Sequence, residues 1–529
     1  MMLRHVVFYL LVFIATATAA VASDLPVIPR PAYVEVGEGV FRSGPKLDVD
    51  ADPAILTALR QAIETDGGPD ISSPFGGRPR VTLTVEPDLV REIGEEGYLL
   101  SVRPNSVKAR ASKPVGLFYA IQTLRQLAWA GGGRGEWVLP CCEIKDRPRF
   151  AWRGFMLDES RHFSGPDAVK RLLDAMALLK LNRFHWHLTD ETAWRIEIKE
   201  LPKLTEIGAL TPPTLHDYLA KPKFYFYTQQ QVRELVAYAL ERGIVIVPEI
   251  NMPGHATAAN RAYPEYSGGG RERPGYTLNP ASEATFLYLE TILCEVDEMF
   301  PDAAILHLGG DEVSHGWQKW SELPEVKELM AKEGLKDLSG VEAYFKRRMA
   351  SFVASLGTKA GFWMAGAEQG IPPDQAVLFW WRHEAQGQLR AAVNGGYSIV
   401  LCPRLPCYFD FGQYSSHTAG ARWTGKLFFN TLRSVYAFPD SLLATLSKDA
   451  NVLGIQANLW TETAVTQERR DFLTFPRLYA LAEAAWTPAE GKDYAGFEER
   501  LKAHLPRLRA TGIVPWDPFA KTPEGFQDE

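Results

Sequence analysis

Cysteine is scarce in this chain of 529 residues, and its spacing excludes the simplest metal-binding motifs. No pair of C-x-x-C motifs is present, so the cysteines predict no zinc site. Their odd number leaves at least one of them without an intrachain partner. Cys402 and Cys407 can close a small loop in an oxidising compartment, whereas most of the five are expected to be free and buried. The cysteines are Cys141, Cys142, Cys294, Cys402 and Cys407.

Runs of positive charge and long apolar segments are missing as well. The 57 Lys and Arg residues are outnumbered by 64 Asp and Glu residues, which gives a net charge of −7. A nucleic-acid partner is not expected, because phosphate binding needs a basic face. Beyond the N-terminus, no apolar stretch is long enough to predict a transmembrane helix. The length and the hydrophobic content of 46% are typical of a globular protein with one large and one smaller domain.

The N-terminus has the pattern of an export signal. Arg4 and His5 precede the apolar stretch Val6–Ile14, and Ala20-Val21-Ala22 supplies an A-x-A cleavage site before Ser23. An uncleaved anchor is the alternative, but the apolar run is short for a bilayer span. We therefore expect residues 1–22 to be removed and the protein to be exported, to the periplasm or the outside of the cell.

Residues 24–148 are predicted to form a small α+β domain. Residues 80–85 alternate apolar and polar side chains as a strand does, and residues 98–102 are predicted to form another strand. Between residues 114 and 129 the apolar residues recur at helical spacing. A glycine-rich loop and a proline-containing connection then lead into the next unit.

From about residue 149 to residue 515, helical patterns alternate with apolar strands. This alternation over some 350 residues predicts a parallel sheet, and the length suits a (β/α)8 TIM-type barrel. Helices are predicted to begin near residue 164 and to span 229–242 and 281–299, and strands to span 182–188, 244–247 and 304–308.

Acidic residues or histidine follow each of these three strands. The first strand is followed by Thr189-Asp190-Glu191, the second by a segment that ends at His255, and the third by Gly309-Gly310-Asp311-Glu312. The carboxyl ends of barrel strands meet at one face, where barrel enzymes build their active sites. We therefore expect these side chains to share a pocket.

Asp311 and Glu312 are the strongest candidates for chemistry. Two adjacent carboxylates repel each other, and desolvation in a cleft raises the pKa of at least one. An acid that is still protonated near neutral pH can donate a proton to a leaving oxygen. An exposed acidic turn is the alternative, but the preceding residues 305–308 are apolar enough for a buried strand.

A signature motif and six further segments, in the family's order, resemble glycoside hydrolase family 20, the β-N-acetylhexosaminidases. The signature is His307-Leu308-Gly309-Gly310-Asp311-Glu312, and residues before 150 resemble the small α+β domain that precedes the barrel in this family. The other matching segments are 152–158, 185–190, 248–255, 408–410, 459–462 and 475–478.

The resemblance implies a substrate-assisted mechanism in which the substrate's own 2-acetamido oxygen attacks the anomeric carbon. Such enzymes are exceptions to the rule that glycosidases use two enzyme carboxylates. Glu312 would protonate the leaving oxygen and later activate water, with retention of configuration. Asp311 would orient the acetamido nitrogen, and Tyr408 would donate to the acetamido oxygen. No cofactor and no metal are implied.

The resemblance assigns the remaining candidates to supporting roles. Asp190 and His255 would hydrogen-bond behind Glu312 and tune its proton affinity, whereas His187 and Glu191 are expected to be structural. The groups expected to hold sugar hydroxyls are Arg153, Asp410 and Glu462. An apolar box for the acetamido methyl group would be built by Trp363, Trp381 and Trp460, with Trp380 competing for the second position.

The chain departs from the family pattern at three positions near these candidates. Asn251 stands where the family often has Asp, and Met364 and Ala365 follow Trp363 where an acidic pair is common. The expected ligands are glycans ending in N-acetylglucosamine or N-acetylgalactosamine, or chitin oligomers. The departures leave the choice among them open.

Two other classes of protein compete with this interpretation. His185-x-His187 beside a strand is compatible with a metal-dependent hydrolase, which would recruit His255 and Asp311 as further ligands. A non-catalytic sugar-binding protein on the same scaffold is the other. The presence of Asp311, Glu312 and Tyr408 together favours catalysis, because binding alone needs no poised acid.

Overall fold

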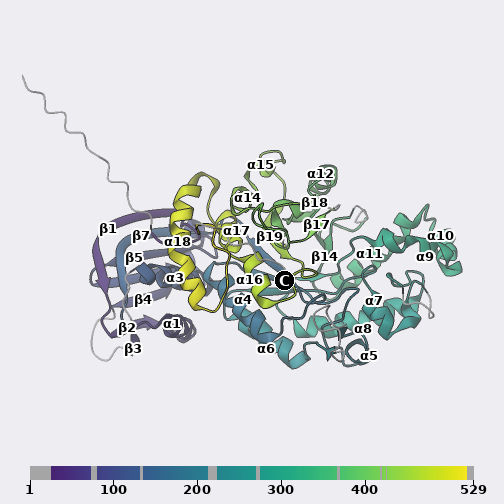
Figure 1. Ribbon diagram of the computed structural model, residues 1–529, viewed down its shortest axis with the longest axis horizontal. Helices are drawn as coiled ribbons and strands as arrows, with labels where there is room; N and C mark the ends of the chain where they lie inside the picture. Colours follow the sequence, from purple (N-terminus) through teal and green to yellow (C-terminus); the bar gives the residue numbers. More distant parts are fainter. Residues whose placement is uncertain are drawn as a thin grey trace, which may run out of the picture.

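A computed structural model describes most of the chain and has two parts (Figure 1). A small sheet domain lies at one end, a barrel occupies the middle, and a helical extension formed by α9 (Trp317–Glu322) and α10 (Pro324–Glu333) lies at the other end. The predicted export signal lies outside the described residues. The described residues are 25–72, 80–130, 135–211, 223–269, 275–365, 370–417, 420–423 and 426–520.

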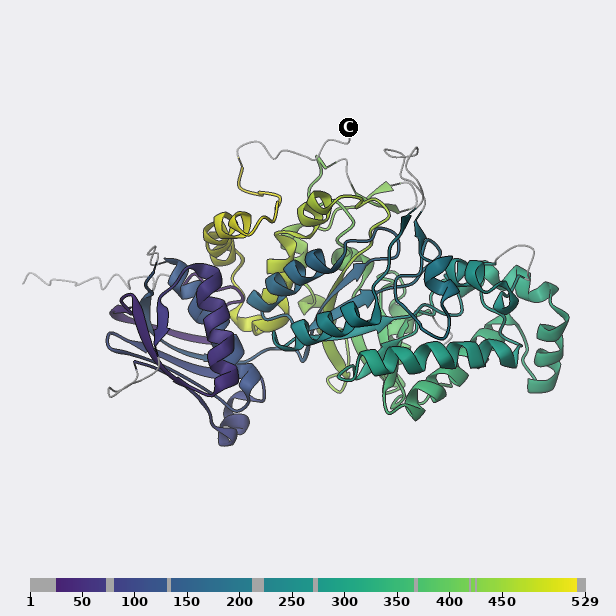
Figure 2. The same cartoon turned by 90° about the horizontal axis from the view of Figure 1, so that it is seen from below.

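The N-terminal domain is a seven-stranded mixed sheet covered by helices. Its strand order is β1-β7-β5-β6-β4-β2-β3, and α1 (Pro53–Asp66) and α3 (Pro114–Ala130) pack against it (Figure 2). The pattern predicted for residues 98–102 is realised, because alternate side chains of β5 are buried. The strands are β1 (Tyr33–Arg42), β2 (Lys46–Ala51), β3 (Asp70–Ser72), β4 (Val81–Val85), β5 (Tyr98–Arg103), β6 (Ser106–Ala111) and β7 (Val138–Asp146).

Eight parallel strands then close into a barrel. In spatial order each strand pairs with the next, and β19 closes the ring on β8. Every residue of β8 and β15 is buried, as expected for strands with the barrel interior on one side and helices on the other. The strands are β8 (Trp152–Asp158), β9 (Arg183–His187), β12 (Val245–Glu249), β13 (Ile305–His307), β14 (Lys359–Trp363), β15 (Ala376–Trp380), β16 (Ser398–Leu401) and β19 (Val452–Leu459).

Helices follow most of these strands and cover the barrel (Figures 1 and 2). The described residues between β14 and β15 contain no helix, so this connection departs from the regular pattern. The covering helices are α4 (Pro166–Leu178), α6 (Gln229–Leu240), α8 (Glu283–Met299), α11 (Leu338–Ser355), α12 (Gln386–Asn394), α14 (Leu432–Ala437), α16 (Gln467–Thr474), α17 (Arg477–Trp486) and α18 (Tyr494–Ala510).

Shorter elements lie in the connections. They do not change the predicted architecture, a TIM-type barrel preceded by an α+β domain, which the structure confirms. They are α2 (Val90–Ile93), α5 (Lys203–Glu206), α7 (Thr257–Ala262), α13 (Arg404–Cys407), α15 (Asp440–Leu443), β10 (Leu210–Thr211), β11 (Lys223–Phe224), β17 (Arg422–Trp423) and β18 (Lys426–Leu427).

Buried charges join the two domains at the amino ends of the barrel strands. Arg153, near the start of β8, donates to both carboxylate oxygens of Glu96 from the N-terminal domain, at 2.7 and 3.0 Å. Lys180 Nζ lies 3.1 Å from Asp146 Oδ2 at the end of β7, and neither side chain is exposed. Buried charges are tolerated when they are paired and hydrogen-bonded. Here the barrel domain supplies the cations and the N-terminal domain supplies the anions.

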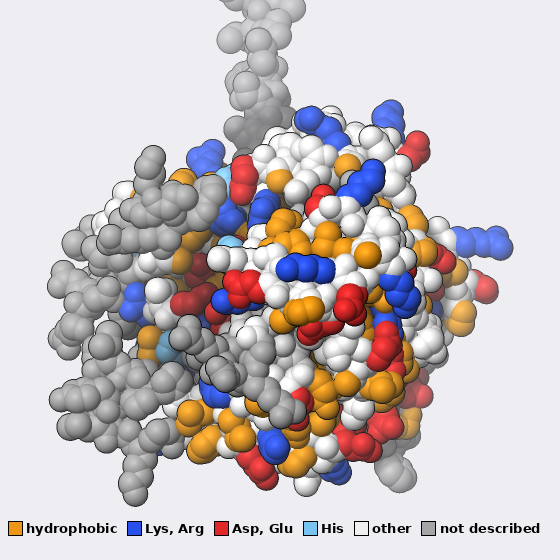
Figure 3. Space-filling model, turned by 90° about the vertical axis from the view of Figure 1, so that its right-hand side faces the viewer, with side chains coloured by type: hydrophobic (Ala, Val, Ile, Leu, Met, Phe, Trp, Pro, Cys, Tyr) orange, Lys and Arg blue, Asp and Glu red, His pale blue; other side chains and the backbone are white. Residues whose placement is uncertain are grey.

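The surface and the cysteines agree with a globular protein. Acidic and basic side chains are interspersed with apolar ones on the end that carries α9 and α10 (Figure 3). Among the described residues, no helix combines the length and the apolar character needed to cross a bilayer. All five cysteines are free, so Cys402 and Cys407 do not form the loop-closing disulfide that their spacing allowed.

Candidate active site

Three neighbouring strands bring the predicted acids and histidine together. Because β9, β12 and β13 are adjacent and parallel, the segments that follow them meet at the same end of the barrel. Asp190 follows β9, His255 follows β12, and Asp311 and Glu312 follow β13. The side chains that the sequence predicted to lie together are therefore within contact distance of one another.

The backbone at these strand ends adopts conformations that are uncommon for side-chain-bearing residues. Gly309 and Gly310 have φ of 67° and 82°, and a Cβ atom on Gly309 would collide with the side chain of Asn251. His255 and Glu312 also lie in the left-handed region, with φ of 52° and 48°. Each such residue costs on the order of 1–3 kcal/mol and is commonly found at functional sites. The packing around Glu312 therefore holds its backbone in this uncommon conformation.

A chain of hydrogen bonds runs behind Glu312. His187 Nε2 lies 2.8 Å from Asp190 Oδ2, and His255 Nδ1 lies 3.0 Å from Asp190 Oδ1. The other nitrogen of His255 faces Asp311 Oδ2 at 3.5 Å and Glu312 Oε2 at 3.8 Å. Asp190 therefore fixes the orientation of the imidazole that contacts both acids.

Charges alternate along this chain, which we call the relay (His187, Asp190, His255). Burial disfavours the ionised carboxylate, yet Arg161 and the two histidines hold the pKa of Asp190 well below its usual range. Burial also disfavours a charged imidazole, but Asp190 and Asp311 raise the pKa of His255 well above its ordinary value. The relay is therefore a row of paired ions.

Asp311 does not become the neutral acid of the pair. Burial alone would raise its pKa, but the imidazolium of His255 lowers the pKa of this carboxyl below its ordinary value. Asn251 Nδ2 also donates to Asp311 Oδ1 at 3.4 Å, which an Asp at position 251 could not do when ionised. The side chain of Asp311 is 13% exposed, whereas that of Glu312 is 37% exposed. The two acids therefore occupy different environments.

Aromatic side chains form a wall next to the relay, where the rings of Trp460 and His187 lie 5.0 Å apart. Trp363, Trp381 and Tyr408 belong to one buried cluster, and Trp460 packs against it. The ring of Trp460 lies 5.8 Å from that of Trp363 and 6.1 Å from that of Tyr408. Trp380 belongs to the larger core instead, so the structure places Trp381 and not Trp380 with the aromatic wall.

The prediction that Arg153 binds the sugar is wrong. Its guanidinium is fully buried at the opposite end of β8, where it donates to Glu96, Tyr119, Lys180 O and Phe150 O. These bonds leave it no free direction toward a ligand.

Arg161, and not Arg153, lies among the predicted site residues. It lies 2.8 Å from Asp190 Oδ2 and 3.6 Å from Glu462 Oε1, so it connects the relay with a second predicted hydroxyl-binding residue. Arg161 follows the first barrel strand, β8, whose carboxyl end the sequence analysis did not include. The row of charged residues that begins at Asp158 was the signal that could have found it.

Asp410 lies near Glu462. It is buried, and burial followed by the nearby Glu462 carboxylate raises the pKa of Asp410 well above its usual range. Within the described chain, Asp410 Oδ1 and Trp460 Nε1 have no hydrogen-bond partner. Buried polar atoms of this kind normally find a partner, which makes both atoms candidates for ligand contacts.

The ligand set of a metal-dependent hydrolase is not brought together. His187 lies between two carboxylates, Glu249 and Asp190, whereas His255 and Asp311 are grouped separately from His185. Among the described residues, the clusters with metal-binding geometry are His185–Glu249–His307, Asp190–Glu191–His255 and His255–Asp311–Glu312.

Two consecutive parts of the sequence match the two domains of one protein family. Residues 24–147 match the description "Glycosyl hydrolase family 20, domain 2", and residues 150–489 match "Glycosyl hydrolase family 20, catalytic domain". The chain belongs to glycosyl hydrolase family 20. The motif resemblance described above is therefore confirmed.

Named relatives agree with this assignment. A β-hexosaminidase from Porphyromonas gingivalis is 36% identical over 460 residues, which cover 83% of this chain and 57% of that protein. A β-hexosaminidase from Vibrio furnissii is 34% identical over 487 residues, covering 87% of this chain and 76% of its own length. The crystal structure of an exo-β-N-acetylglucosaminidase from Vibrio harveyi with N-acetylglucosamine has a TM-score of 0.85 at 31% identity, covering 94% of this chain and 79% of that one.

The charged imidazole of His187 makes stability depend on pH. Despite burial, Glu249 and Asp190 raise its pKa to about 10 from the ordinary 6.5. The folded protein then keeps a proton that the unfolded chain releases. The stabilisation that this proton provides is therefore complete below pH 6.5 and is lost as pH rises toward 10.

We expect the urea midpoint of unfolding to fall less steeply between pH 6.5 and pH 10 in His187→Gln than in the wild type. His504→Gln is the control, because burial lowers the pKa of His504 to about 4 and it carries no such proton. Equal slopes in His187→Gln and the wild type would contradict the assignment.

The two arginines should fail in different ways. Arg153→Met leaves Glu96 without its buried partner, and we expect unfolding to become easier by about 3–5 kcal/mol while the folded fraction keeps its KM. Arg161→Met removes the cation that is paired with Asp190 of the relay and should lower kcat/KM roughly 10–100-fold with a smaller change in stability. Thermal melts and kinetics on an aryl β-N-acetylglucosaminide separate the two outcomes. If KM rose in Arg153→Met and not in Arg161→Met, the roles assigned to the two arginines would be wrong.

Proposed function

We infer that this protein is an exo-acting β-N-acetylhexosaminidase that cleaves terminal non-reducing N-acetylhexosamine residues with retention of configuration. The observation that carries this inference is the unequal pair of acids, with Asp311 held ionised by His255 while Glu312 stands at the more open edge. A substrate-assisted reaction needs one enzyme acid and one ionised partner for the acetamido group, and not two interchangeable carboxylates.

In the first step the substrate provides the nucleophile. The 2-acetamido oxygen bonds to the anomeric carbon as the glycosidic C–O bond breaks, and Glu312 donates its proton to the departing oxygen. The acetamido nitrogen gains positive charge in the resulting oxazolinium ion. The Asp311 carboxylate, fixed by His255 and Asn251, accepts a hydrogen bond from that nitrogen and stabilises the charge.

In the second step water restores the enzyme. Glu312, now a carboxylate, takes a proton from a water molecule whose oxygen bonds to the anomeric carbon, and the oxazolinium ring opens. Both attacks occur at the anomeric carbon from opposite faces, so the product keeps the configuration of the substrate. The same side chain serves as acid and then as base.

The aromatic wall suits the acetamido methyl group. Trp363, Trp381 and Trp460 present flat apolar surfaces, and Tyr408 supplies a hydroxyl that can donate to the acetamido oxygen. Burial raises the pKa of Tyr408 well above its ordinary value, so the hydroxyl keeps the proton it must donate. Asp410, Glu462 and Arg161 are positioned to bind hydroxyl groups of the terminal sugar.

The substrates that we propose are glycans ending in N-acetylglucosamine or N-acetylgalactosamine, and chitin oligomers. Support comes from the Vibrio harveyi relative, which was solved with N-acetylglucosamine bound. We also propose that the protein acts in the periplasm or outside the cell, on the basis of the export signal in residues 1–22.

Replacing Glu312 by Gln removes the transferable proton and keeps the size of the side chain. We expect kcat on an aryl β-N-acetylglucosaminide to fall by at least about 10²–10⁴-fold with a modest change in KM. Glu322→Gln, an exposed residue of α9, is the matched control and should retain full activity. The wild type should leave the corresponding aryl β-glucoside uncleaved, because that substrate lacks the acetamido nucleophile. Equal rates on both substrates would rule out substrate assistance.

Export and cleavage can be measured directly. When the full chain is produced in a bacterium with a general secretion pathway, we expect the exported protein to begin at Ser23, as determined by mass spectrometry of its N-terminus. Ala22→Arg should block cleavage and leave residues 1–22 attached. Retention of the whole activity in the cytoplasm would contradict the proposed location.

A further inference from the structure

A buried carboxylate inside the barrel contacts both the relay and the aromatic wall. Glu249, the last residue of β12, is fully buried. Its Oε2 lies 2.6 Å from His187 Nδ1, and its Oε1 lies 2.6 Å from Trp363 Nε1. An indole N–H can only donate, so Oε1 accepts from the wall while Oε2 accepts from the relay. One side chain therefore joins two parts of the site.

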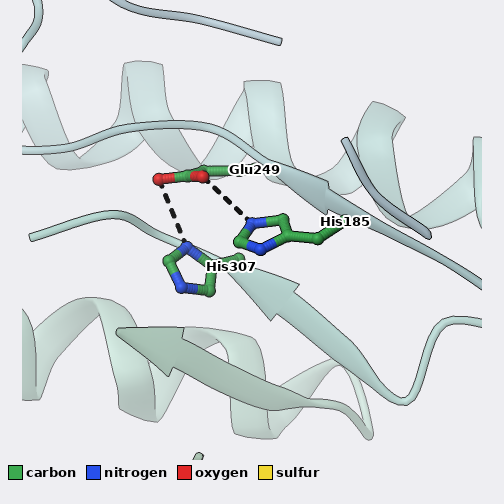
Figure 4. A group of neighbouring side chains, drawn as sticks. All are labelled: His185, Glu249 and His307. Atoms are coloured by element: carbon green, nitrogen blue, oxygen red, sulfur yellow. Dashed lines mark ion pairs between the residues drawn. The ribbon is translucent and has the colours of Figure 1, made fainter. Parts of the chain in front are cut away.

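Two further imidazoles enclose the same carboxylate (Figure 4). His185 Nε2 lies 3.0 Å from Oε2, and His307 Nδ1 lies 3.3 Å from Oε1. Gln456 donates its amide N–H to His185 Nδ1 at 3.0 Å, so a neutral His185 carries its proton on Nε2, the nitrogen that lies 3.0 Å from Glu249 Oε2. The carboxylate is thus surrounded on both oxygens, and its rotation is restricted.

Filling the barrel interior does not by itself explain a charge at this position. Barrel interiors are commonly packed with branched apolar side chains, and burying an ion costs several kcal/mol unless it is well paired. Burial would raise the pKa of Glu249, but His187 and His307 hold it well below the usual range. The carboxylate is therefore ionised, and the imidazolium of His187 is its counter-charge.

We propose that Glu249 is a positioning residue that holds the relay and the Trp363 wall in one fixed arrangement around the reacting sugar. This proposal rests on the function inferred above and adds a residue that touches neither the sugar nor the acid. It acts through His187 on one side and through Trp363 on the other.

The consequence for the relay follows from the number of protons on His187. A doubly protonated ring donates to Glu249 and to Asp190 Oδ2 at once, which leaves Asp190 Oδ1 for His255. A neutral ring has one N–H and can keep only one of these bonds. Without the charge of Glu249, the second bond would be lost at a lower pH.

The other titratable groups around Glu249 limit what can produce a pH effect. Burial and the neighbouring His307 lower the pKa of His185 to about 4, so His185 is neutral over the working range. Burial raises the pKa of the Cys402 thiol, which remains protonated. His307 faces the carboxylate from β13, and Asp311 is ionised and feels the charge of Glu249. His187 is the group that Glu249 keeps charged.

The test compares Glu249→Gln with a matched buried carboxylate. Glu249→Gln keeps the shape of the side chain and removes its charge, and we expect kcat to fall roughly 10–100-fold. The alkaline limb of kcat/KM should move to lower pH, because His187 then loses its proton more easily. Glu483→Gln on α17 breaks an equally buried pair with Arg500 and should lower the melting temperature without moving the pH profile. A wild-type pH profile and kcat in folded Glu249→Gln would overturn the proposal.

Two further single variants keep Glu249 and test its contacts with Trp363 and with His187 separately. They keep the proposal testable if Glu249→Gln does not fold. Trp363→Phe keeps an aromatic wall but removes the N–H, and it should raise KM without moving the alkaline limb. His187→Gln should lower kcat, and its effect combined with Glu249→Gln should be less than additive. Unchanged kinetics in both single variants would also overturn the proposal. Failure of the wild type on the aryl β-N-acetylglucosaminide would instead refute the proposed function.

Discussion

The pairing of Asp190 with three cations is the interaction on which the rest of the site depends. This buried carboxylate contacts Arg161, His187 and His255, and each of these side chains also contacts a further acid: Glu462, Glu249 and Asp311, respectively. Ionised groups in a protein interior are stable only when the partners match in number and geometry. Each of these charged side chains is paired with one of opposite charge. The orientation of Asp311 and Glu312 therefore depends on ion pairs that do not include them directly.

The backbone conformation also restricts the orientation of the acids. His255 and Glu312 both occupy the left-handed region, which side-chain-bearing residues seldom adopt. Gly309 and Gly310 allow the chain to turn close to Asn251 just before the acids. A relaxed loop would point Glu312 elsewhere, so the cost of the strained turn is offset by the packed surroundings that hold it.

Residues at the strand ends were predictable from the sequence because periodicity and motif order point to the same place. Asp190, His255, Asp311 and Glu312 each follow a recognisable strand, and parallel topology brings such positions together. Neither property distinguishes the two ends of one strand. Arg153 is the second residue of the motif that forms the whole of β8, and only the three-dimensional fold shows that it contacts the N-terminal domain.

The details that depend on which way a side chain points could not be predicted either. Trp380 and Trp381 are adjacent, and a difference of one residue decides whether an indole faces the barrel interior or the surrounding helices. The role of Glu249 was equally hidden, because a Pro-Glu pair after an apolar run gives no sign of the histidines on other strands. Such partners are distant in sequence and are found only in the folded chain.

The buried ion pairs between the two domains affect whether the barrel can be produced without the small domain. Glu96 and Asp146 neutralise Arg153 and Lys180, which lie deep under the barrel. The small domain therefore acts as a counter-ion for the large one. A barrel cut free at residue 149 would keep two cations in an apolar floor with no anion to meet them. Although two consecutive family models describe these domains, we expect a barrel without the small domain to be less stable than the full chain, because it would bury unpaired cations.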